Sequence, residues 1–334
     1  MTTSPIRLAF IGAGLFARDA HVPSLLALGD TFTVTCVYSR TEASAQALAD
    51  LLPYAVDITT DLDSVFSRDN VDAVDITLPI PMLPEMVTRA LQSGKHVISE
   101  KPIAPTVAIA QPLLEIPLQD GQVWMVGENW RYETLFEQAG DVLRSGKIGT
   151  PLHFSWVLQL PVTPDNKYYH TAWRRDPAYP GGFLLDGGVH HIAAIRQVLG
   201  EVVAVQAMTT QMSADLPPAD TLTAALRMAD GTTGAYGVTY AGGANTLQDL
   251  TVIGTDGHLS VSRDLLSVHV GDTSQHTRSR PHGVQKELEA FAAAIHNGTP
   301  HRNTPQAALQ DLAVMEALLN SAQQGQQVEV MQIS

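Results

Sequence analysis

The feature that most constrains this chain is a glycine-rich turn that directly follows its first strand-like run. Residues 6–11 are mostly apolar and are followed at once by Gly12-Ala13-Gly14-Leu15-Phe16-Ala17, a G-x-G-x-x-A sequence that opens a helix. In that context Gly12 permits a tight turn, Gly14 lets the backbone approach a pyrophosphate, and small Ala17 allows close packing of helix on strand. The unpaired N–H groups at the helix start then face the phosphates. The pattern predicts a dinucleotide site, and the alternative is a glycine turn without a ligand.

The end of the second strand bears on which dinucleotide is bound. For NAD, an Asp or Glu about 20 residues after the glycines binds the ribose hydroxyls. This chain instead reads Val37-Tyr38-Ser39-Arg40, without a carboxylate. A hydroxyl followed by a guanidinium suits a 2′-phosphate, so the sequence predicts a preference for NADP(H) over NAD(H). The alternative is that Arg40 only caps a surface turn. The predicted cofactor-binding residues are Gly12, Ala13, Gly14, Leu15, Phe16, Ser39, Arg40, Leu78, Pro79, Glu100 and Lys101.

Short β-branched runs alternate with helix-period segments up to about Gly127, which predicts βαβ units around a parallel sheet. Several of the strands are apolar on both faces, as expected when helices cover both sides. The expected strands are Ile6–Ile11, Phe32–Tyr38, Tyr54–Ile58, Val71–Leu78, His96–Ser99 and Val123–Val126, and the expected helices are Glu42–Leu51, Met82–Ser93 and Pro105–Leu118.

The pattern of expected strands and helices changes after Gly127, which predicts a second domain. A helix at Leu135–Ser145 precedes a period-2 strand at His153–Leu160, and Asp230-Gly231 and Asp256-Gly257 are hairpin signals between strand-like runs. Helical pattern returns at Val284–His296 and Gln306–Gln323. The predicted fold class is α/β, with a doubly wound Rossmann domain at residues 1–127 and an α+β domain at 128–334 whose open sheet is mainly antiparallel.

Composition excludes several classes of partner. Thirty-four acidic against twenty basic residues give a net charge of −14, which repels phosphate backbones and anionic lipid. Nucleic acid and membrane are therefore not expected as partners. Cys36 is the single cysteine, and the first residues carry no basic and apolar leader pattern. These features predict a cytoplasmic protein without disulfides or a multi-cysteine metal site.

Two segments carry groups suited to proton transfer. Lys101 lies in Ser99-Glu100-Lys101-Pro102 at the end of the fifth expected strand, the edge where ligands bind in open α/β sheets. Asp186 and His190 are four residues apart, so on a helix they share one face, where the carboxylate orients the imidazole. The alternatives are an exposed lysine and a structural histidine pair. A metal site formed by Asp186, His190 and His191 is a further alternative, which is disfavoured because adjacent histidines on a helix point to different faces.

Together these motifs resemble the glucose-fructose oxidoreductase and inositol dehydrogenase family, Gfo/Idh/MocA. The resemblance rests on Gly12–Ala17, on the run from Ala90 to Pro102 and on Gly181–His190. Arg131-Tyr132, the turn at 146–149 and the closing 287–328 pattern extend it over nearly the whole chain. The chain departs from the family pattern at Leu78-Pro79-Ile80, where Thr-Pro-Asn is common, and at Ala193, where Asp is common.

The resemblance implies hydride transfer between nicotinamide and a hydroxyl or carbonyl of a sugar, cyclitol or related small molecule. Lys101, Asp186 and His190 are then the catalytic group, with no metal. His190, oriented by Asp186, exchanges the hydroxyl proton while Lys101 binds the same oxygen, or the two residues exchange these roles. The long irregular segment Pro161–Gly182 lines a site or is a surface excursion. The expected substrate contacts are Tyr168, Tyr169, Trp173, Arg174 and His191.

Partners and rival functions follow from the same resemblance. The open sheet of the second domain predicts a homodimer or homotetramer. One alternative function is a non-catalytic dinucleotide sensor, although the presence of Lys101, Asp186 and His190 disfavours it. Another is a hydrolase or lyase that uses transient oxidation by bound NAD(P).

Overall fold

The computed structural model describes residues 4–176, 179, 181–243, 246–247 and 249–333. The chain forms two compact units. The first contains Met1–Asn129 and Val284–Leu309, and the second contains Trp130–Gly283 and Gln310–Ser334. The domains predicted from the sequence, residues 1–127 and 128–334, differ from these units chiefly in one segment. Residues 284–309, expected in the second domain, belong to the first unit.

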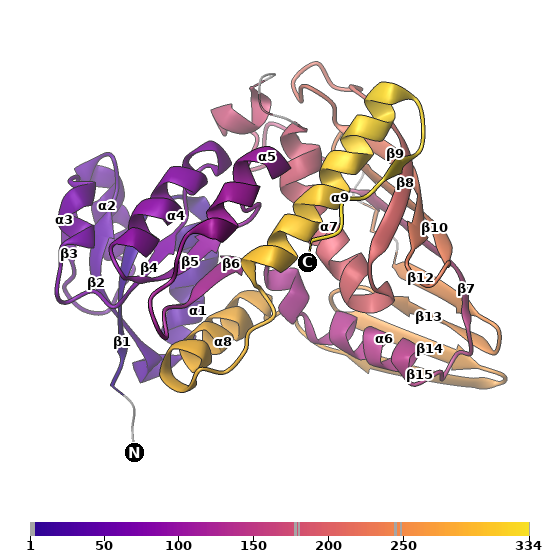
Figure 1. Ribbon diagram of the computed structural model, residues 1–334, viewed down its shortest axis with the longest axis horizontal. Helices are drawn as coiled ribbons and strands as arrows, with labels where there is room; N and C mark the ends of the chain where they lie inside the picture. Colours follow the sequence, from indigo (N-terminus) through magenta and orange to yellow (C-terminus); the bar gives the residue numbers. More distant parts are fainter. Residues whose placement is uncertain (1–3, 177–178, 180, 244–245, 248, 334) are drawn as a thin grey trace. The chain divides into compact units, whose positions relative to one another are not determined.

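The first unit is built on a parallel sheet in the order β3-β2-β1-β4-β5-β6 (Figure 1). Every neighbouring pair is parallel. The order reverses between β1 and β4, which creates the switch point where doubly wound sheets bind ligands. The predicted Rossmann fold is confirmed. The strands are β1 Ile6–Ile11, β2 Phe32–Tyr38, β3 Asp57–Thr59, β4 Ala73–Ile76, β5 His96–Glu100 and β6 Trp124–Gly127.

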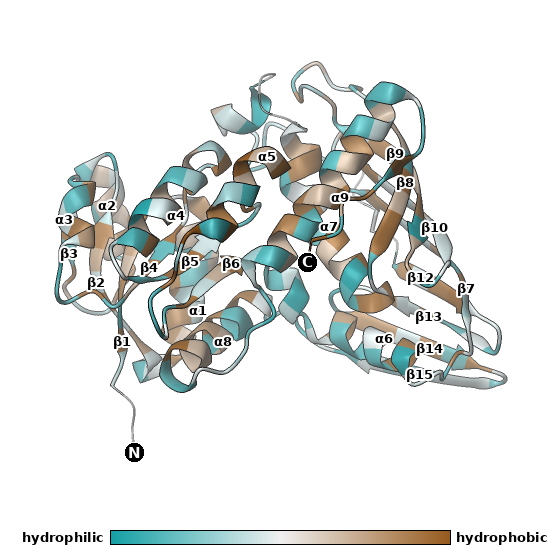
Figure 2. Cartoon of the chain, viewed as in Figure 1, coloured by the Kyte–Doolittle hydropathy of each residue, from teal (hydrophilic) through white to brown (hydrophobic). Residues whose placement is uncertain are grey.

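Helix α4 of the first unit is amphipathic and carries hydrophilic and hydrophobic residues on different sides (Figure 2). The helix expected over 105–118 is wrong in extent. Only Val107–Ala110 is α-helical, because Pro112 lacks the N–H that would continue the helix, and a 3-10 turn follows. The α-helices are α1 Val22–Ala27, α2 Glu42–Ala49, α3 Leu62–Phe66, α4 Leu83–Gln92, α5 Val107–Ala110 and α8 Gly283–Asn297, and the short π and 3-10 segments are Ala17–His21, Gly29–Thr31, Ile80–Met82 and Gln111–Glu115.

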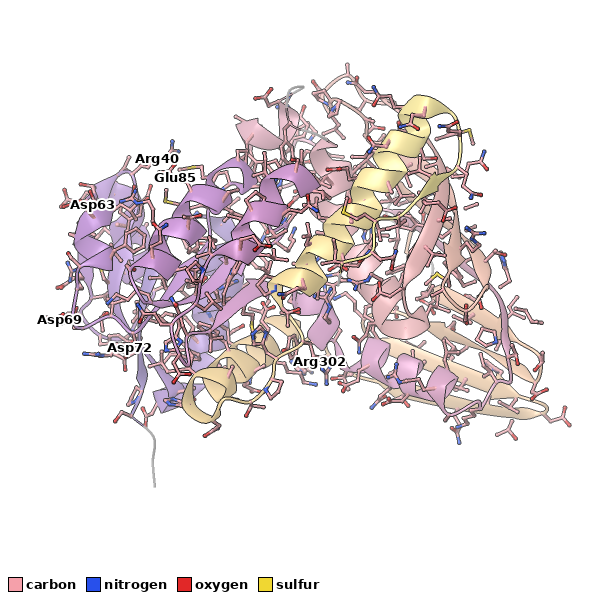
Figure 3. The ribbon with its side chains drawn as sticks, viewed as in Figure 1. Arg40, Asp63, Asp69, Asp72, Glu85 and Arg302 are labelled. Carbon is pink, nitrogen blue, oxygen red and sulfur yellow. The ribbon has the colours of Figure 1, made fainter. Side chains whose placement is uncertain are left out.

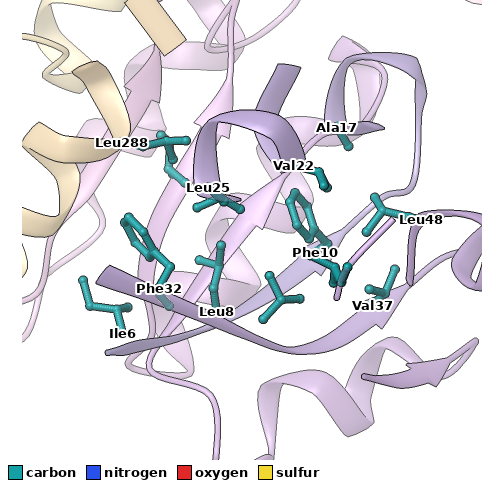
Figure 4. Packing of buried hydrophobic residues seen from close by; sticks show 14 of the residues in the cluster. Ile6, Leu8, Phe10, Ala17, Val22, Leu25, Phe32, Val37, Leu48 and Leu288 are labelled. Atoms are coloured by element: carbon teal, nitrogen blue, oxygen red, sulfur yellow. The ribbon is translucent and has the colours of Figure 1, made fainter. Parts of the chain in front are cut away.

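The core of the first unit explains why α8 belongs to it. Leu8 and Phe10 of β1 are fully buried, and Leu288 and Phe291 of α8 belong to the same hydrophobic cluster. Figure 4 shows Leu288 beside the side chains from β1 and the first helix. Burying apolar side chains of this size stabilises a fold by about 1.5–3 kcal/mol each. The packing therefore draws the distant segment into the first unit.

The second unit contains a ten-stranded sheet in the order β15-β14-β13-β12-β7-β10-β9-β8-β16, with β11 paired to β7. Among its described pairs, β7 and β10 are parallel and the others antiparallel. Both predicted Asp-Gly hairpins are confirmed, as β9–β10 and β12–β13. The strands are β7 Pro151–Gln159, β8 Val202–Thr210, β9 Thr221–Met228, β10 Thr233–Thr239, β11 Thr246–Leu247, β12 Leu250–Gly254, β13 Gly257–Val261, β14 Leu265–Val270, β15 Thr273–Arg278 and β16 Val328–Glu329.

One face of this sheet is buried and the other is open. Along β7, Phe154, Trp156 and Leu158 are buried while the residues between them are exposed. This alternation is typical of a strand with helices on one side only. Among the described residues, no helix is long and apolar enough to cross a membrane. The helical segments of the unit are α6 Thr134–Arg144, Ala172–Arg175 and α7 Gly182–Leu199, together with Asn129–Tyr132 and α9 Pro305–Gln324, whose first residues belong to the first unit.

Candidate active site

The glycine turn lies between the ends of β2 and β4. Gly12 has a φ of +109°, and a Cβ built on it would lie 2.7 Å from the carbonyl oxygen of Thr77. The Gly12 N–H donates to the Tyr38 carbonyl at 3.0 Å, and the Thr77 hydroxyl donates to the Gly12 carbonyl at 2.9 Å. Only glycine fits this position, for both conformational and steric reasons. Gly14 is exposed, and the helix begins at Leu15. This turn fits the pyrophosphate of a dinucleotide.

Several predicted cofactor residues meet at this edge of the sheet. Ser39 and Arg40 follow β2 directly, and the Ser39 N–H donates to the Thr59 carbonyl at 3.2 Å. The side chain of Leu78 lies against Gly12, since its Cδ2 is 3.0 Å from the Cβ position of that residue. Arg40 is exposed, and its side chain extends outward from the ribbon (Figure 3). The guanidinium is therefore available to a ligand from this edge.

Glu100 and Lys101 lie at the end of β5. Lys101 is half-buried and follows the last strand residue. Glu100 is the last residue of that strand. In the structure its Oε1 lies 3.0 Å from Nε2 of His21, a residue that sequence reasoning did not single out.

His21 is buried, and both of its ring nitrogens contact carboxylates. Nδ1 lies 2.6 Å from Oδ2 of Asp75 in the middle of the sheet. Burial alone lowers the pKa of His21, but the charges and hydrogen bonds of Asp75 and Glu100 together raise that pKa well above its ordinary value. One sequence signal could have indicated such a partner: Asp75 interrupts the otherwise apolar strand Ala73–Ile76.

The second unit places Asp186 and His190 on α7. The helical spacing predicted for them is confirmed, since α7 covers Gly182–Leu199. Oδ2 of Asp186 accepts a hydrogen bond from Nε of Arg174 at 2.7 Å. The Arg174 guanidinium also lies over the rings of Trp173, at 4.2 Å, and Tyr168, at 5.0 Å. Three of the predicted substrate contacts therefore gather beside Asp186.

The two other predicted contacts lie elsewhere. The Tyr169 ring contacts the guanidinium of Arg175 at 4.5 Å, and its pKa is raised chiefly by a hydrogen bond with Asp215. His191 is buried, with Nδ1 at 2.8 Å from the hydroxyl of Tyr236. The burial of His191 favours a structural role over substrate contact. Of the irregular segment 161–182, residues Pro177, Ala178 and Pro180 lie outside the described part of the chain.

The His190 ring packs against an aromatic cluster. Its centroid lies 5.5 Å from that of Trp130, with the planes only 15° apart. The guanidinium of Arg263 lies 5.1 Å from the Trp130 ring, and Glu133 accepts hydrogen bonds from Arg263. Stacking of this kind fixes the plane of an imidazole. His190 is therefore held by packing as well as by its place on α7.

Two tyrosines beside Asp186 were missed by sequence reasoning. Tyr179 and Tyr240 are buried, and their hydroxyls have no hydrogen-bond partner among the described residues. Burial raises the pKa of both phenols, and the charge of Asp186 raises it further. A Cβ on Gly187 would collide with the Tyr240 hydroxyl, at 1.9 Å, so this glycine admits the ring. Unsatisfied buried hydroxyls of this kind are available to hydrogen-bond a polar ligand.

No group of three His, Cys, Asp or Glu side chains in the described ranges is arranged to hold a metal ion. The second unit contributes groups that can exchange protons or hydrogen-bond a polar ligand: the carboxylate of Asp186, the imidazole of His190 and the phenols of Tyr179 and Tyr240. In the first unit they are the amino group of Lys101 and the glycine turn. These are the parts that a nicotinamide-dependent oxidoreductase needs for cofactor binding and proton transfer.

Comparison with known proteins supports this chemistry. Residues 6–128 match the model of an oxidoreductase family with an NAD-binding Rossmann fold, and residues 136–260 match the Gfo/Idh/MocA C-terminal domain. A dehydrogenase of Fusarium mangiferae is 32% identical, covering 95% of this chain and 96% of the relative. A D-apiose dehydrogenase of Paraburkholderia graminis is 26% identical over 98% and 91%.

A solved structure matches as well. The crystal structure of an oxidoreductase from Thermotoga maritima has a TM-score of 0.91 and 34% identity, covering 97% of this chain and 98% of that one. The family models match regions within both units, and relatives above 30% identity match nearly their whole length. The chain therefore belongs to the Gfo/Idh/MocA family of oxidoreductases, whose amino-terminal domain is an NAD-binding Rossmann fold.

Proposed function

We propose that this protein is an NAD(P)-dependent dehydrogenase or reductase that acts on a hydroxyl or carbonyl group of a sugar-like small molecule. The observation that carries the proposal is the group around Asp186, where a carboxylate, a guanidinium and two unpartnered phenol hydroxyls gather one turn from His190. Such a set matches a ligand with several hydroxyl groups. The similarity to a D-apiose dehydrogenase supports the same substrate class.

The proposed roles follow from the proton balance of the reaction. A bound nicotinamide accepts or supplies the hydride. Oxidation of the substrate hydroxyl to a carbonyl also releases a proton, which a neighbouring base must accept. His190 accepts that proton at its imidazole, and its ring is stacked on Trp130. The proposed role of Asp186, one turn earlier on α7, is to orient this imidazole. Lys101 hydrogen-bonds the same substrate oxygen, or Lys101 and His190 exchange these roles.

The proposed substrate contacts are Arg174, Tyr168 and Trp173, joined by Tyr179 and Tyr240. Aromatic rings stack on the apolar faces of sugars, while phenols and guanidinium groups bind their hydroxyls. Arg174 connects the two kinds of group, because it binds Asp186 and packs on two aromatic rings. Tyr169 and His191 are not part of this set.

For the cofactor, we propose a preference for NADP(H). Ser39 and Arg40 follow β2 next to the glycine turn, and the exposed guanidinium of Arg40 suits a 2′-phosphate. Cys36 is buried in β2 and fits a reducing compartment, so the proposed location is the cytoplasm.

The open face of the second sheet is the proposed interface of a homodimer or homotetramer. Val157 of β7 is 40% exposed and Ile253 of β12 is 47% exposed. Ile253 is paired with His153, which shares the exposed face with Val157, so both apolar side chains lie on that face. A broad sheet face with exposed apolar residues suits burial against an identical face.

A substrate panel tests the proposed activity. The purified protein is mixed with NADP⁺ or NAD⁺ and a panel of aldoses, cyclitols and anhydrosugars, and the nicotinamide absorbance is followed together with the products. Reduction of the cofactor in step with formation of a carbonyl product is expected. Cofactor binding without turnover on any member would favour a sensor. Product formation without net reduction would favour a hydrolase or lyase that uses transient oxidation.

A further inference from the structure

A buried ion cluster joins the helix of the glycine turn to β5, the strand that precedes Lys101. His21 is 1% exposed, and its two nitrogens contact Asp75 of β4 at 2.6 Å and Glu100 of β5 at 3.0 Å. Asp75 is fully buried, and the Glu100 side chain is nearly so. All three residues lie in the first unit.

The two contacts determine the chemical state of the ring. A neutral imidazole has one N–H, so it can donate to only one of the two carboxylates. The imidazolium donates to both, and each bond is then charge-assisted. The geometry therefore favours a protonated His21 between two carboxylates, and the raised pKa of His21 agrees with this assignment.

A wide helical turn places His21 in the interior. Residues Ala17–His21 form a π-helical segment directly after the glycine turn, and the Val22 N–H donates to the Ala17 carbonyl five residues earlier. Such π turns often occur at functional sites. The Phe16 ring packs edge-on against His21, with centroids 5.2 Å apart. His21 therefore belongs to the helical segment that begins at the glycine turn, the proposed site of the cofactor phosphates.

We propose that His21 is a positioning residue, which ties Glu100, and through the backbone Lys101, to the helix that begins at the glycine turn. The inference rests on the proposed role of Lys101 in proton transfer. Glu100 immediately precedes Lys101, so a shift of Glu100 moves the amino group of its neighbour. Small displacements of a catalytic group cost large factors in rate. His21 therefore acts on turnover without touching substrate.

The surroundings of Glu100 make its bond to His21 important. A Cβ on Gly127 would lie 3.4 Å from Oε1 of Glu100 and 3.8 Å from Oε1 of Glu287 on α8. Glu287 is fully buried, and its Oε1 has no partner among the described residues. The charge of Glu100 helps to keep Glu287 protonated, so the cation beside Glu100 on this side is His21. Removal of the imidazolium would leave Glu100 without the cation that fixes its position.

Two amide substitutions separate the contacts of the ring. The side-chain amide of Asn reproduces the position of Nδ1 and that of Gln the position of Nε2. H21N therefore keeps a donor for Asp75, whereas H21Q keeps a donor for Glu100. We expect H21N to lower kcat by about tenfold or more, H21Q to lower it less, and both to lower the melting temperature. The matched control is H96Q, at the opposite end of β5 from Lys101.

A double-mutant cycle distinguishes positioning from a merely structural role. In a K101A background, H21N should lower kcat by less than about twofold, because its effect runs through the missing amino group. All rates are measured on the folded holoenzyme with the substrate found in the panel and normalised to the folded fraction by circular dichroism. Should H21N not fold, E100L and E100Q replace it, and E100Q, which keeps an acceptor for Nε2–H, should lose less turnover.

The outcomes are separable. If K101A itself leaves kcat unchanged, the proposed role of Lys101 fails and the positioning role fails with it. If K101A lowers kcat but H21N and H21Q are equally active, or H21N lowers kcat equally in both backgrounds, only the role of His21 is overturned. A fall in kcat with H96Q as large as with H21N would also overturn it.

Discussion

Arg174 donates from Nε to Oδ2 of Asp186 at 2.7 Å while its guanidinium lies over the Trp173 ring. This pair ties the irregular segment before α7 to the residue one helical turn before His190. We expect R174A to lower kcat/KM by about tenfold or more, because Asp186 loses its cationic partner and the aromatic side chains lose their anchor. R174K should recover part of the loss, since it keeps the charge but not the planar fork.

The neighbouring arginine provides the control for that experiment. Arg175 contacts Tyr169 and bonds the Asp215 carbonyl, away from Asp186. R175A should leave kcat/KM within about twofold of the wild type, as surface substitutions away from a site usually do. Equal effects of R174A and R175A would show that the Arg174–Asp186 pair has no special role.

Lys101 and His190 are each expected to be needed for turnover. K101A and H190A should each lower kcat by at least about a hundredfold, the scale of general acid–base catalysis, with cofactor affinity nearly unchanged. The double variant should lose less than the product of the single losses, because the two residues serve one proton transfer. Stopped-flow rates and fluorescence titration of the cofactor measure both quantities. K147A, which removes an exposed lysine, is the control, and wild-type turnover in both test variants would refute the assignment.

Cofactor choice is expected to depend on Ser39 and Arg40. NADPH should bind more tightly than NADH. R40A should weaken the binding of NADPH by about 1.5–3 kcal/mol, the range for a hydrogen bond to a charged group. S39D should reverse the preference, since a carboxylate repels the 2′-phosphate and binds the ribose hydroxyls. Fluorescence titration of both cofactors decides the matter. Equal or tighter binding of NADH by the wild type would mean that Arg40 only caps a surface turn.

The open sheet face is expected to mediate self-association. V157K and I253K should each shift the protein toward the monomer in sedimentation velocity at micromolar concentration, because a charge on this face opposes its burial. M212K is the control, since Met212 is 68% exposed but follows the end of β8. A wild-type protein that sediments as a monomer would contradict the proposed interface.

Glu287 predicts an unusual dependence of stability on pH. Burial raises the pKa of Glu287 well above its ordinary value; the charge of His21 opposes this, and the carboxylates of Glu100, Glu128 and Asp75 add to it. Above about pH 4.3 the unfolded chain releases this proton while the folded protein keeps it. The contribution of Glu287 to stability therefore declines as the pH rises toward its folded pKa.

Substitution by Gln removes this proton uptake. The melting temperature of E287Q relative to the wild type should rise between about pH 5 and about pH 8. E289Q, on the exposed side of the same helix, should show a constant difference. A difference for E287Q that does not change with pH would mean that Glu287 is ionised in the folded protein.

The sequence predicted most of the sheet architecture because local pattern controls it. Ile6–Ile11 and Phe32–Tyr38 have the expected bounds, since apolar runs between turn signals leave little choice of where a buried strand begins and ends. The helix over 105–118 failed for a local reason that was visible in the sequence, Pro112. The place of residues 284–309 failed for a tertiary reason, because the partners of Leu288 lie at the other end of the chain.

In the candidate site, the sequence motifs identified individual residues but did not predict which residues contact one another. Gly12, Lys101, Asp186 and His190 stand in recognisable spacings. The partners of His21 are 54 and 79 residues away, and no spacing rule joins them. Tyr179 and Tyr240 are likewise brought to Asp186 only by folding. Asp75, a carboxylate inside an apolar strand, was the one local sign that a buried cation must be near.

Because α8 belongs to the first unit, the order of translation affects when the core of that unit can form. A ribosome completes the sixth strand of the parallel sheet at Gly127 and then translates about half the chain before Leu288 and Phe291 exist. During that interval the nascent sheet lacks part of its hydrophobic cover, and such exposed surface is prone to aggregation and chaperone binding. A gene fragment that stops after Asn129 would produce the same uncovered intermediate permanently. The hydrophobic core of the first unit can therefore be completed only after a segment near the other end of the chain has been translated.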